Sequence, residues 1–142
     1  MYHLACKYLP EHGYPQYEIS NFSQKNFESR HNLNFWKGKD FIGIGLSAAS
    51  FFNSQEWENT NTWKNYLAGD VPTKRKLSSS ELKINKLLLN IRLNRGVATK
   101  QINSTKLKSL LESKLISIKE KKIYLTPKGQ DLENQVSQII YS

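Results

Sequence analysis

The stretch from Tyr17 to Phe52 constrains the fold of this chain most strongly. It holds three short phrases in order: a strand-like YEISNF, a polar and aromatic HNLNFW, and a glycine-punctuated FIGIGLSAAS. Within the first, the apolar Tyr17 and Ile19 are separated by the polar Glu18, which is the alternation of a half-buried strand. A helix-forming segment and a glycine turn come before it. The order helix, turn, strand is one step of an α/β barrel or layered sheet.

The two later phrases predict a binding region. From Phe22 to Lys39 the sequence loses periodicity and becomes polar, which predicts a long loop anchored by aromatic residues such as Phe35 and Trp36. Asp40–Gly45 returns to strand composition, with glycines that leave the backbone bare. The small side chains of Ser47–Ser50 then predict a cavity wall. The glycines alone favour a tight strand crossing or bulge instead, since GIG without a following helix is a weak phosphate-binding signal.

The second half of the sequence predicts a winged-helix-like domain. Ser78 and Glu81 form a capping-box pattern at the start of a helix that extends to about Asn94. Three further elements complete the order helix, helix, hairpin, helix. They are a helix over Ser104–Ser113, a hairpin of Leu115–Ile118 and Lys122–Leu125, and a last helix N-capped by Thr126. The basic, proline-bearing Val71–Lys76 is the predicted linker, which divides the chain into domains 1–70 and 71–142.

Composition narrows the class of protein. With 142 residues, 38% hydrophobic, the chain can form one ordinary domain or two small ones. It has no long apolar run and no signal-peptide pattern, so we expect a cytoplasmic protein. Its single cysteine, Cys6, has no partner for a disulfide and cannot alone hold a zinc ion or an iron-sulfur cluster.

The charge of +9 lies almost entirely in the second half. Residues 1–70 carry a net charge of −1 and residues 71–142 carry +10. Such a basic half can face nucleic acid or an anionic membrane, or form an ordinary solvated surface. The expected recognition helix exposes Lys106, Lys108, Ser109 and Glu112 rather than the Arg, Asn or Gln that read base edges. This disfavours a nucleic-acid partner and leaves peripheral membrane contact open.

The three phrases, at this spacing, resemble consecutive segments of the radical-SAM heme chaperone family, often described as oxygen-independent coproporphyrinogen III oxidase-like. The opening helix and the LTPKG segment before the final helix are similar to the same family, so the resemblance covers essentially the whole chain. It implies an α/β fold: the last β/α unit or units of a partial radical-SAM barrel, followed by the small winged-helix-like α+β domain. We expect the other barrel strands on a region outside this chain, and an exposed strand edge prone to self-association.

The HNLNFW phrase carries the expected heme site. In the chaperone branch of the family, an HNxxYW pattern is associated with heme binding, and the oxidase branch lacks it. The resemblance implies that His31 is a candidate iron ligand, that Asn32 orients it or meets a propionate, and that Trp36 packs on the porphyrin face or holds the loop. Phe35 stands where the family has tyrosine, so the role of that hydroxyl is missing here.

The FIGIGLSAAS phrase is where the family closes over S-adenosylmethionine. Ser47 and Ala49 replace the glycine and histidine usual in the chaperones, and this version is closer to the oxidases. The resemblance implies that Ser47, Ala48 and Ala49 line that cofactor.

The family's CxxxCxxC motif for a [4Fe–4S] cluster cannot exist in a chain with one cysteine. This chain alone therefore cannot start radical chemistry, and its expected partners are a missing N-terminal radical-SAM region and heme-acceptor proteins. The favoured hypothesis is the C-terminal portion of a heme chaperone. The alternatives are a coproporphyrinogen III oxidase of porphyrin biosynthesis, acting by radical decarboxylation, and a basic winged-helix nucleic-acid module.

Overall fold

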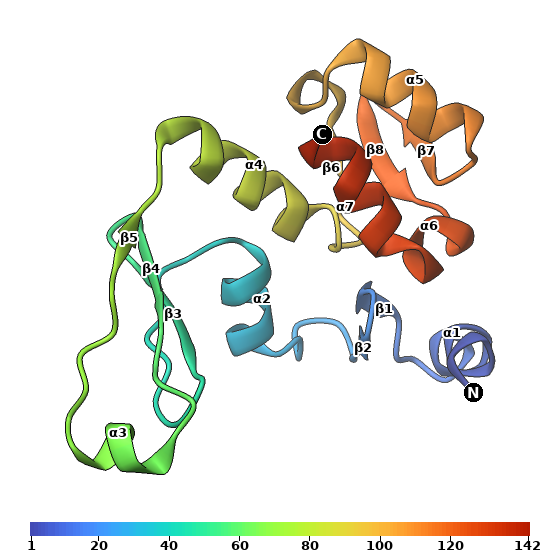
Figure 1. Ribbon diagram of the computed structural model, residues 1–142. Helices are drawn as coiled ribbons and strands as arrows, with labels where there is room; N and C mark the ends of the chain where they lie inside the picture. Colours follow the sequence, from blue (N-terminus) through green and yellow to red (C-terminus); the bar gives the residue numbers. More distant parts are fainter.

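The structure is a computed structural model that describes residues 1–142. Figure 1 shows a domain of helices and a sheet at one side, an arm containing a second sheet at the other, and α2 between them. In chain order the elements are α1 (Tyr2–Glu11), β1 (Gln16–Glu18), β2 (Asn21–Phe22), α2 (Arg30–Trp36), β3 (Ala49–Phe52), β4 (Gln55–Glu58), α3 (Trp63–Leu67), β5 (Arg75–Lys76), α4 (Ser79–Asn90), β6 (Val97–Ala98), the 3-10 helix η1 (Thr99–Gln101), α5 (Ser104–Glu112), β7 (Ile116–Lys119), β8 (Lys122–Leu125), α6 (Pro127–Asp131) and α7 (Glu133–Tyr141).

The hydrophobic core lies in the C-terminal half. Antiparallel strands form a sheet in the order β6-β8-β7, which packs with α4, α5 and α7. Gly129 in α6 permits a close approach there, because a Cβ on it would lie 1.9 Å from the carbonyl oxygen of Leu115. Ten buried apolar residues make up the core: Leu87, Ile91, Val97, Ile102, Leu110, Leu115, Ile116, Ile123, Val136 and Ile140. The predicted order of helix, helix, hairpin and helix is present in this half.

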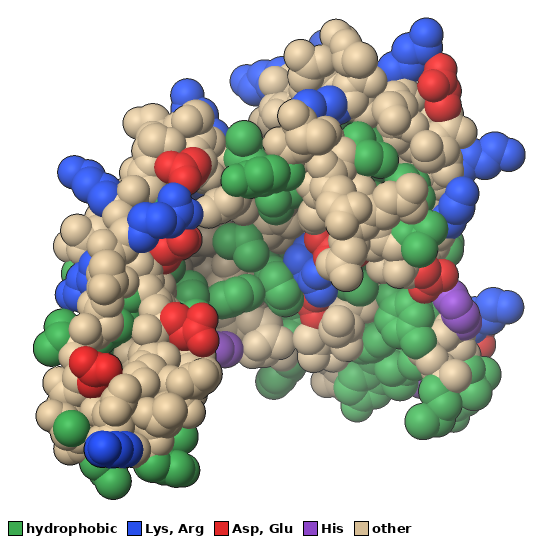
Figure 2. Space-filling model, viewed as in Figure 1, with side chains coloured by type: hydrophobic (Ala, Val, Ile, Leu, Met, Phe, Trp, Pro, Cys, Tyr) green, Lys and Arg blue, Asp and Glu red, His purple; other side chains and the backbone are tan.

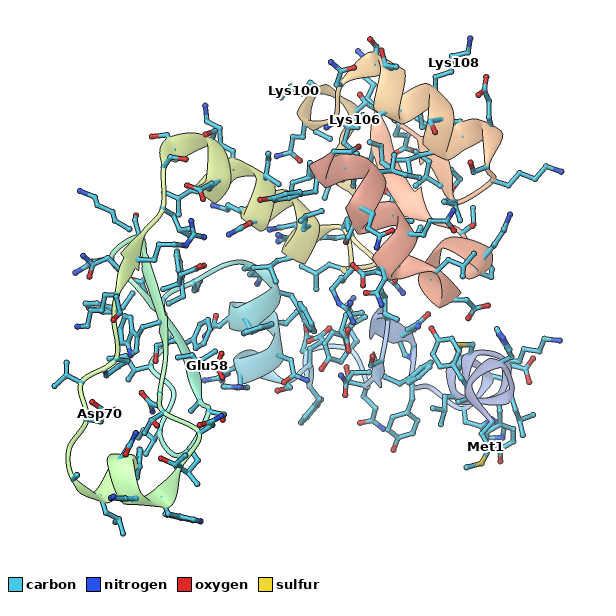
Figure 3. All side chains as sticks on the ribbon, in the orientation of Figure 1. Met1, Glu58, Asp70, Lys100, Lys106 and Lys108 are labelled. Atoms are coloured by element: carbon cyan, nitrogen blue, oxygen red, sulfur yellow. The ribbon has the colours of Figure 1, made fainter.

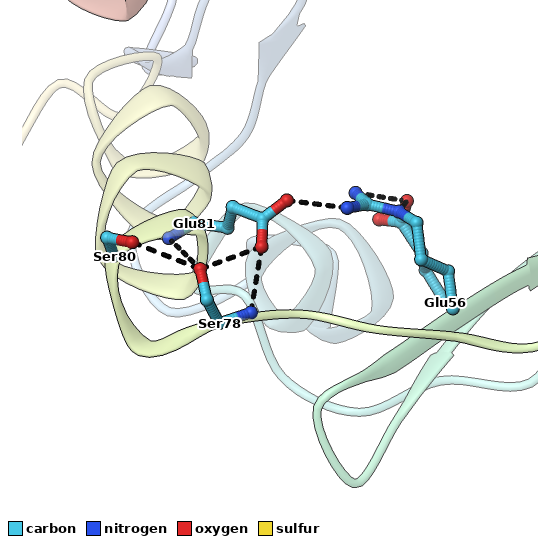
Figure 4. A network of polar contacts seen from close by, with 5 residues as sticks. Glu56, Ser78, Ser80 and Glu81 are labelled. Carbon is cyan, nitrogen blue, oxygen red and sulfur yellow. Dashed lines mark hydrogen bonds and ion pairs between the residues drawn. The ribbon is translucent and has the colours of Figure 1, made fainter.

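The start of α4 is tied to the sheet of the arm, which has the order β3-β4-β5. Ser78 Oγ accepts a hydrogen bond from Glu81 N at 3.3 Å, and the Glu81 carboxylate accepts one from Ser78 N at 2.8 Å. Arg75 of β5 donates to Glu81 at 2.5 Å and to Glu56 of β4 at 2.7 Å (Figure 4). The hydrogen bond from the Ser78 backbone, with those from Arg75 and the Ser78 hydroxyl, lowers the pKa of Glu81 to about 2.

The N-terminal helix is the least covered part of the fold. α1 has no buried residue, and Leu4 exposes 68% of its surface. Two of its side chains attach it to other elements: the Tyr2 hydroxyl donates to Ile19 O at 2.9 Å and accepts from Gln16 Nε2 at 3.0 Å, and His3 lies 3.5 Å from the carboxylate of Asp131. Burial raises the pKa of Tyr2 above its ordinary value.

Several sequence expectations for the first half are wrong. The expected loop from Phe22 to Lys39 contains α2, and the expected strand at Asp40–Gly45 has only one bridge, between Phe41 and Phe51. Glu18, expected on the polar face of a strand, is fully buried; it forms an isolated bridge with Leu93, and its carboxylate accepts a hydrogen bond from the Asn21 side chain.

Other expectations need adjustment. All strand pairs are antiparallel, so the expected barrel units are not confirmed and the structure shows a mixed α/β fold. Part of the predicted linker forms β5, which pairs with β4. The first helix of the C-terminal half ends at Asn90 rather than near Asn94, and the last helix is divided at Leu132 into α6 and α7.

Candidate functional site: a cleft beside helix α2

Helix α2 carries His31. The helix begins after Ser29, whose Oγ accepts from Asn32 N at 3.3 Å, and it ends before Gly38, which has a φ of +64°. A non-glycine residue adopts this left-handed conformation only with strain, so Gly38 suits the end of the helix. The His31 side chain is exposed and takes part in no hydrogen bond or ion pair. Its imidazole nitrogens are therefore free to bind a ligand.

The aromatic residues of α2 have packing partners. The Phe35 ring meets Trp36 edge-on, with centroids 4.9 Å apart, and meets Phe41 at 5.2 Å. The Arg92 guanidinium lies 4.3 Å from the centroid of the Trp36 ring and pairs with Glu133 of α7 at 2.8 Å. α2 is thereby fixed against the C-terminal domain.

A cleft opens between α2, α4 and the sheet of the arm. It has a volume of about 930 Å³, near the top of the roughly 300–1,000 Å³ range of small-molecule sites. Figure 2 shows this hollow with apolar side chains on its floor. Phe35, Phe41, Phe51 and Trp57 line it together with leucines of α4. Its charged groups are mostly at the arm, including Glu58, which Figure 3 shows beside β4.

His31, Asn32 and Trp36 are not among the residues that line the cleft, but His31 lies on the same side of α2 as Phe35. Residues four positions apart on a helix lie one above the other, so His31 lies one turn before Phe35, which lines the cleft. The structure therefore has an aromatic cleft wall with an unpaired histidine one helical turn away from it, which is compatible with a flat apolar ligand but leaves the distance from the imidazole to the cleft to be bridged by that ligand. Asn32 donates from Nδ2 to the Tyr17 hydroxyl at 3.4 Å.

The glycine-punctuated segment forms a turn at the edge of the arm. Ser47 has a φ of +51° and donates from its amide to Thr60 O at 3.1 Å. Asn59 Nδ2 donates to Gly45 O at 2.9 Å, and the Gly45 amide donates to the Tyr66 hydroxyl at 3.1 Å. Among Ser47, Ala48 and Ala49, only Ala49 lines the cleft.

The structure thus brings some of the predicted site residues together. Phe35 and Ala49, from distant parts of the sequence, line the same cleft, and His31 lies on the same face of α2 as Phe35. Sequence reasoning missed Arg92, because nothing local to an arginine after a helix indicates a tryptophan partner in another element. The ligand roles of the predicted residues stay predictions.

The structure contains neither a cluster of metal-binding side chains nor a helix that could span a membrane. No group of three or more His, Cys, Asp or Glu side chains is arranged to hold a metal ion, and the single thiol of Cys6 does not fit a [4Fe–4S] cluster. None of the helices is both long enough and apolar enough to cross a bilayer.

The fold is similar to part of a known radical-SAM enzyme. The solved structure of the coproporphyrinogen III oxidase HemN from Escherichia coli matches with a TM-score of 0.68 and 16% sequence identity. The match covers 97% of this chain and 39% of that enzyme. At this identity the likeness establishes the fold alone.

Sequence comparison identifies the relatives. No protein-family model matches the chain. The heme chaperone HemW of Lactococcus lactis is 26% identical over 152 residues, and HemW of Bacillus subtilis is 28% identical over 155 residues. Each alignment covers 96% of this chain and 40% of the relative, so the chain spans about two fifths of the length of these proteins. The chain is homologous to the HemW heme chaperones over nearly its whole length.

Proposed function

We propose that this chain is the heme-binding, C-terminal portion of a heme chaperone that delivers heme to acceptor proteins. The observation that carries the proposal is the free imidazole of His31, one helical turn from Phe35, which lines an aromatic cleft. Homology to HemW chaperones supports it. In a longer polypeptide, α1 and β1 would form the last part of a radical-SAM barrel, and the exposed Leu4 and Tyr8 fit such a covered position.

The proposal assigns each residue a task. Heme, when bound, would supply an iron that an imidazole nitrogen can ligate. His31 would donate that nitrogen, while Phe35 excludes water from one side of the cleft. Trp36 keeps α2 in place through Arg92. Asn32 is held by the Tyr17 hydroxyl and would orient the neighbouring histidine or meet a propionate.

A heme titration followed by the Soret band tests the assignment. We expect saturable binding to the original chain and binding at least about tenfold weaker to His31→Ala. Loss of a residue that only supports a metal ligand already weakens metal affinity by about tenfold, and loss of the ligand itself should cost no less. His12→Ala is the matched control, since His12 is also exposed but stacks on Tyr8 with centroids 3.8 Å apart. Equal affinities for the original chain and His31→Ala, or no binding by either, would contradict the proposed site.

Coproporphyrinogen III oxidase activity of a longer polypeptide is the second candidate. One observation favours it: Ala49, in the small-residue segment similar to the oxidases, lines the cleft. In that case Ser47, Ala48 and Ala49 would contact S-adenosylmethionine, and residues outside this chain would hold the [4Fe–4S] cluster. Saturable binding of S-adenosylmethionine that Ala49→Leu abolishes would favour this candidate over heme delivery.

A further inference from the structure

The cleft beside α2 contains one unpaired cation, Lys86 of α4. The charged residues that line the cleft are Asp40, Glu56, Glu58, Arg75 and Lys86. Arg75 is neutralised, because it donates to Glu56 at 2.7 Å and to Glu81 at 2.5 Å. Lys86 forms no ion pair. A ligand in the cleft therefore meets a single free positive charge, and that charge comes from α4.

The face of α4 toward the cleft is apolar except at its middle. Leu82, Asn85, Lys86 and Leu89 line the cleft at the i, i+3, i+4 and i+7 spacing of one helical face. A face used for packing alone would be apolar throughout, but here an amide and an ammonium group stand between two leucines. Asn90 donates from Nδ2 to the backbone carbonyl of Lys86 at 2.6 Å and leaves both polar side chains free. The pair is therefore available to bind an acceptor group of a ligand.

Lys86 lies at the far end of a stripe that starts at His31. His31, Phe35 and Gly38 follow one another at i, i+4 and i+7 along α2 and its end, and the last two line the cleft. A Cβ placed on Gly38 would lie 3.7 Å from Lys86 Cγ, so the lysine stem packs beside the bare glycine backbone. Seven residues of helix advance about 10 Å. This length is comparable to the distance in a heme from the central iron to the ends of its propionate groups.

The other charges of the cleft orient such a ligand. Glu58 belongs to β4, and Figure 3 shows it at the arm, away from α4. Neither Glu58 nor Asp40 takes part in an ion pair, so both carboxylates repel an anionic group that approaches the arm. The carboxylates of a ligand are therefore favoured at α4, where Lys86 attracts them, with the flat ring against the aromatic wall.

We propose that Lys86, assisted by Asn85, binds the propionate carboxylates of the heme and restricts the cleft to tetrapyrroles with free carboxylates. This inference rests on the proposed heme-binding function and deepens it. An ammonium group forms a charge-assisted hydrogen bond with a carboxylate, and the neighbouring amide adds a second donor. Asn32 then keeps the task of orienting His31, since its side chain already donates to the Tyr17 hydroxyl at 3.4 Å.

Titrations with ferric heme and with its dimethyl ester, each followed by the Soret band, test the proposal. The ester has the same iron and ring but no carboxylate charge, so the original chain should bind it about fivefold more weakly than heme. Lys86→Glu replaces attraction by repulsion. It should lower the affinity for heme by about tenfold or more, and it should change the affinity for the ester by less than about twofold.

Lys83→Glu is the matched control. Lys83 is exposed on the same helix and does not line the cleft, so this variant changes the net charge equally while solvent screens its effect on the ligand. We expect its affinity for heme to fall by less than about threefold. Unchanged binding of the ester by Lys86→Glu separates the loss of carboxylate recognition from a loss of folding.

Three results would overturn the proposal. Equal affinity of the original chain for heme and for the ester would show that the carboxylates are not recognised. Equal losses in the two glutamate variants would assign the effect to net charge. A parallel loss of heme and ester binding in Lys86→Glu would show that the lysine only supports the end of α2. Heme still binds in all three cases, so the proposed function would stand, whereas no heme binding by the original chain would overturn both.

Discussion

Arg92 is the residue that joins α2 to the C-terminal domain. Its guanidinium stacks on Trp36 and pairs with Glu133, and the two side chains of that ion pair are only 20% and 15% exposed. Removing one partner of such a pair leaves the other charge largely buried without compensation. Arg92 therefore helps to fix the position of α2 and of His31 on it, although Arg92 and His31 are far apart in the sequence.

We predict that Arg92→Ala lowers the free energy of unfolding by about 2–4 kcal/mol, through loss of the ion pair and of the contact with Trp36. Urea unfolding measures the change. Arg95→Ala is the matched control, because Arg95 is exposed and bonds only to Asn90, and its effect should be about 0.5 kcal/mol or less. Similar values for the two variants would show that the junction does not depend on Arg92.

At the level of elements, we predict that the stability of the start of α4 depends on pH. Glu81 caps the helix and pairs with Arg75, and these hydrogen bonds lower its pKa from 4.5 to about 2. A lowered carboxyl pKa contributes stability that is fully present above the unfolded value and is lost as the pH falls toward the folded value. The free energy of unfolding should therefore decrease as the pH falls from 4.5 to about 2.

Denaturant unfolding at a series of pH values checks this expectation. Glu81→Gln should flatten the pH dependence in that window, since it removes the titrating carboxyl. Glu11→Gln, at the exposed end of α1, should leave the dependence as it was. If the slope of the Glu81 variant matched that of the original chain, the cap would not be the source of the acid sensitivity.

Across the whole molecule, the structure that depends on residues close in the sequence was predicted well. The pairing of residues from distant segments was not. The capping box at Ser78 and the alternation in β8 lie within a few residues, so the sequence is sufficient to place α4 and the wing. α2 was missed because HNLNFW is too short and polar to show helical periodicity. Its packing depends on Arg92, which comes from another element.

The candidate site, too, was predicted where nearby residues determine it and missed where distant segments meet. The residue types of HNLNFW indicated a heme ligand through the family resemblance, whereas the cleft forms only when Phe35, Ala49 and the leucines of α4 come together. Asp40–Gly45 was predicted to form a strand, but Asn59 and Tyr66 hold its glycine end in a turn through hydrogen bonds to the Gly45 backbone. Such side-chain contacts have no signature within the segment itself.

The most direct measurement of the central claim is chemical rescue of the iron ligand. The absorption and resonance Raman spectra of the ferric heme complex would be recorded for the original chain and for His31→Ala, each with and without added imidazole. We predict a histidine-ligated spectrum for the original chain, its loss in the variant, and its return when imidazole occupies the vacated position. An unchanged ligation spectrum in His31→Ala without imidazole would show that His31 is not the ligand.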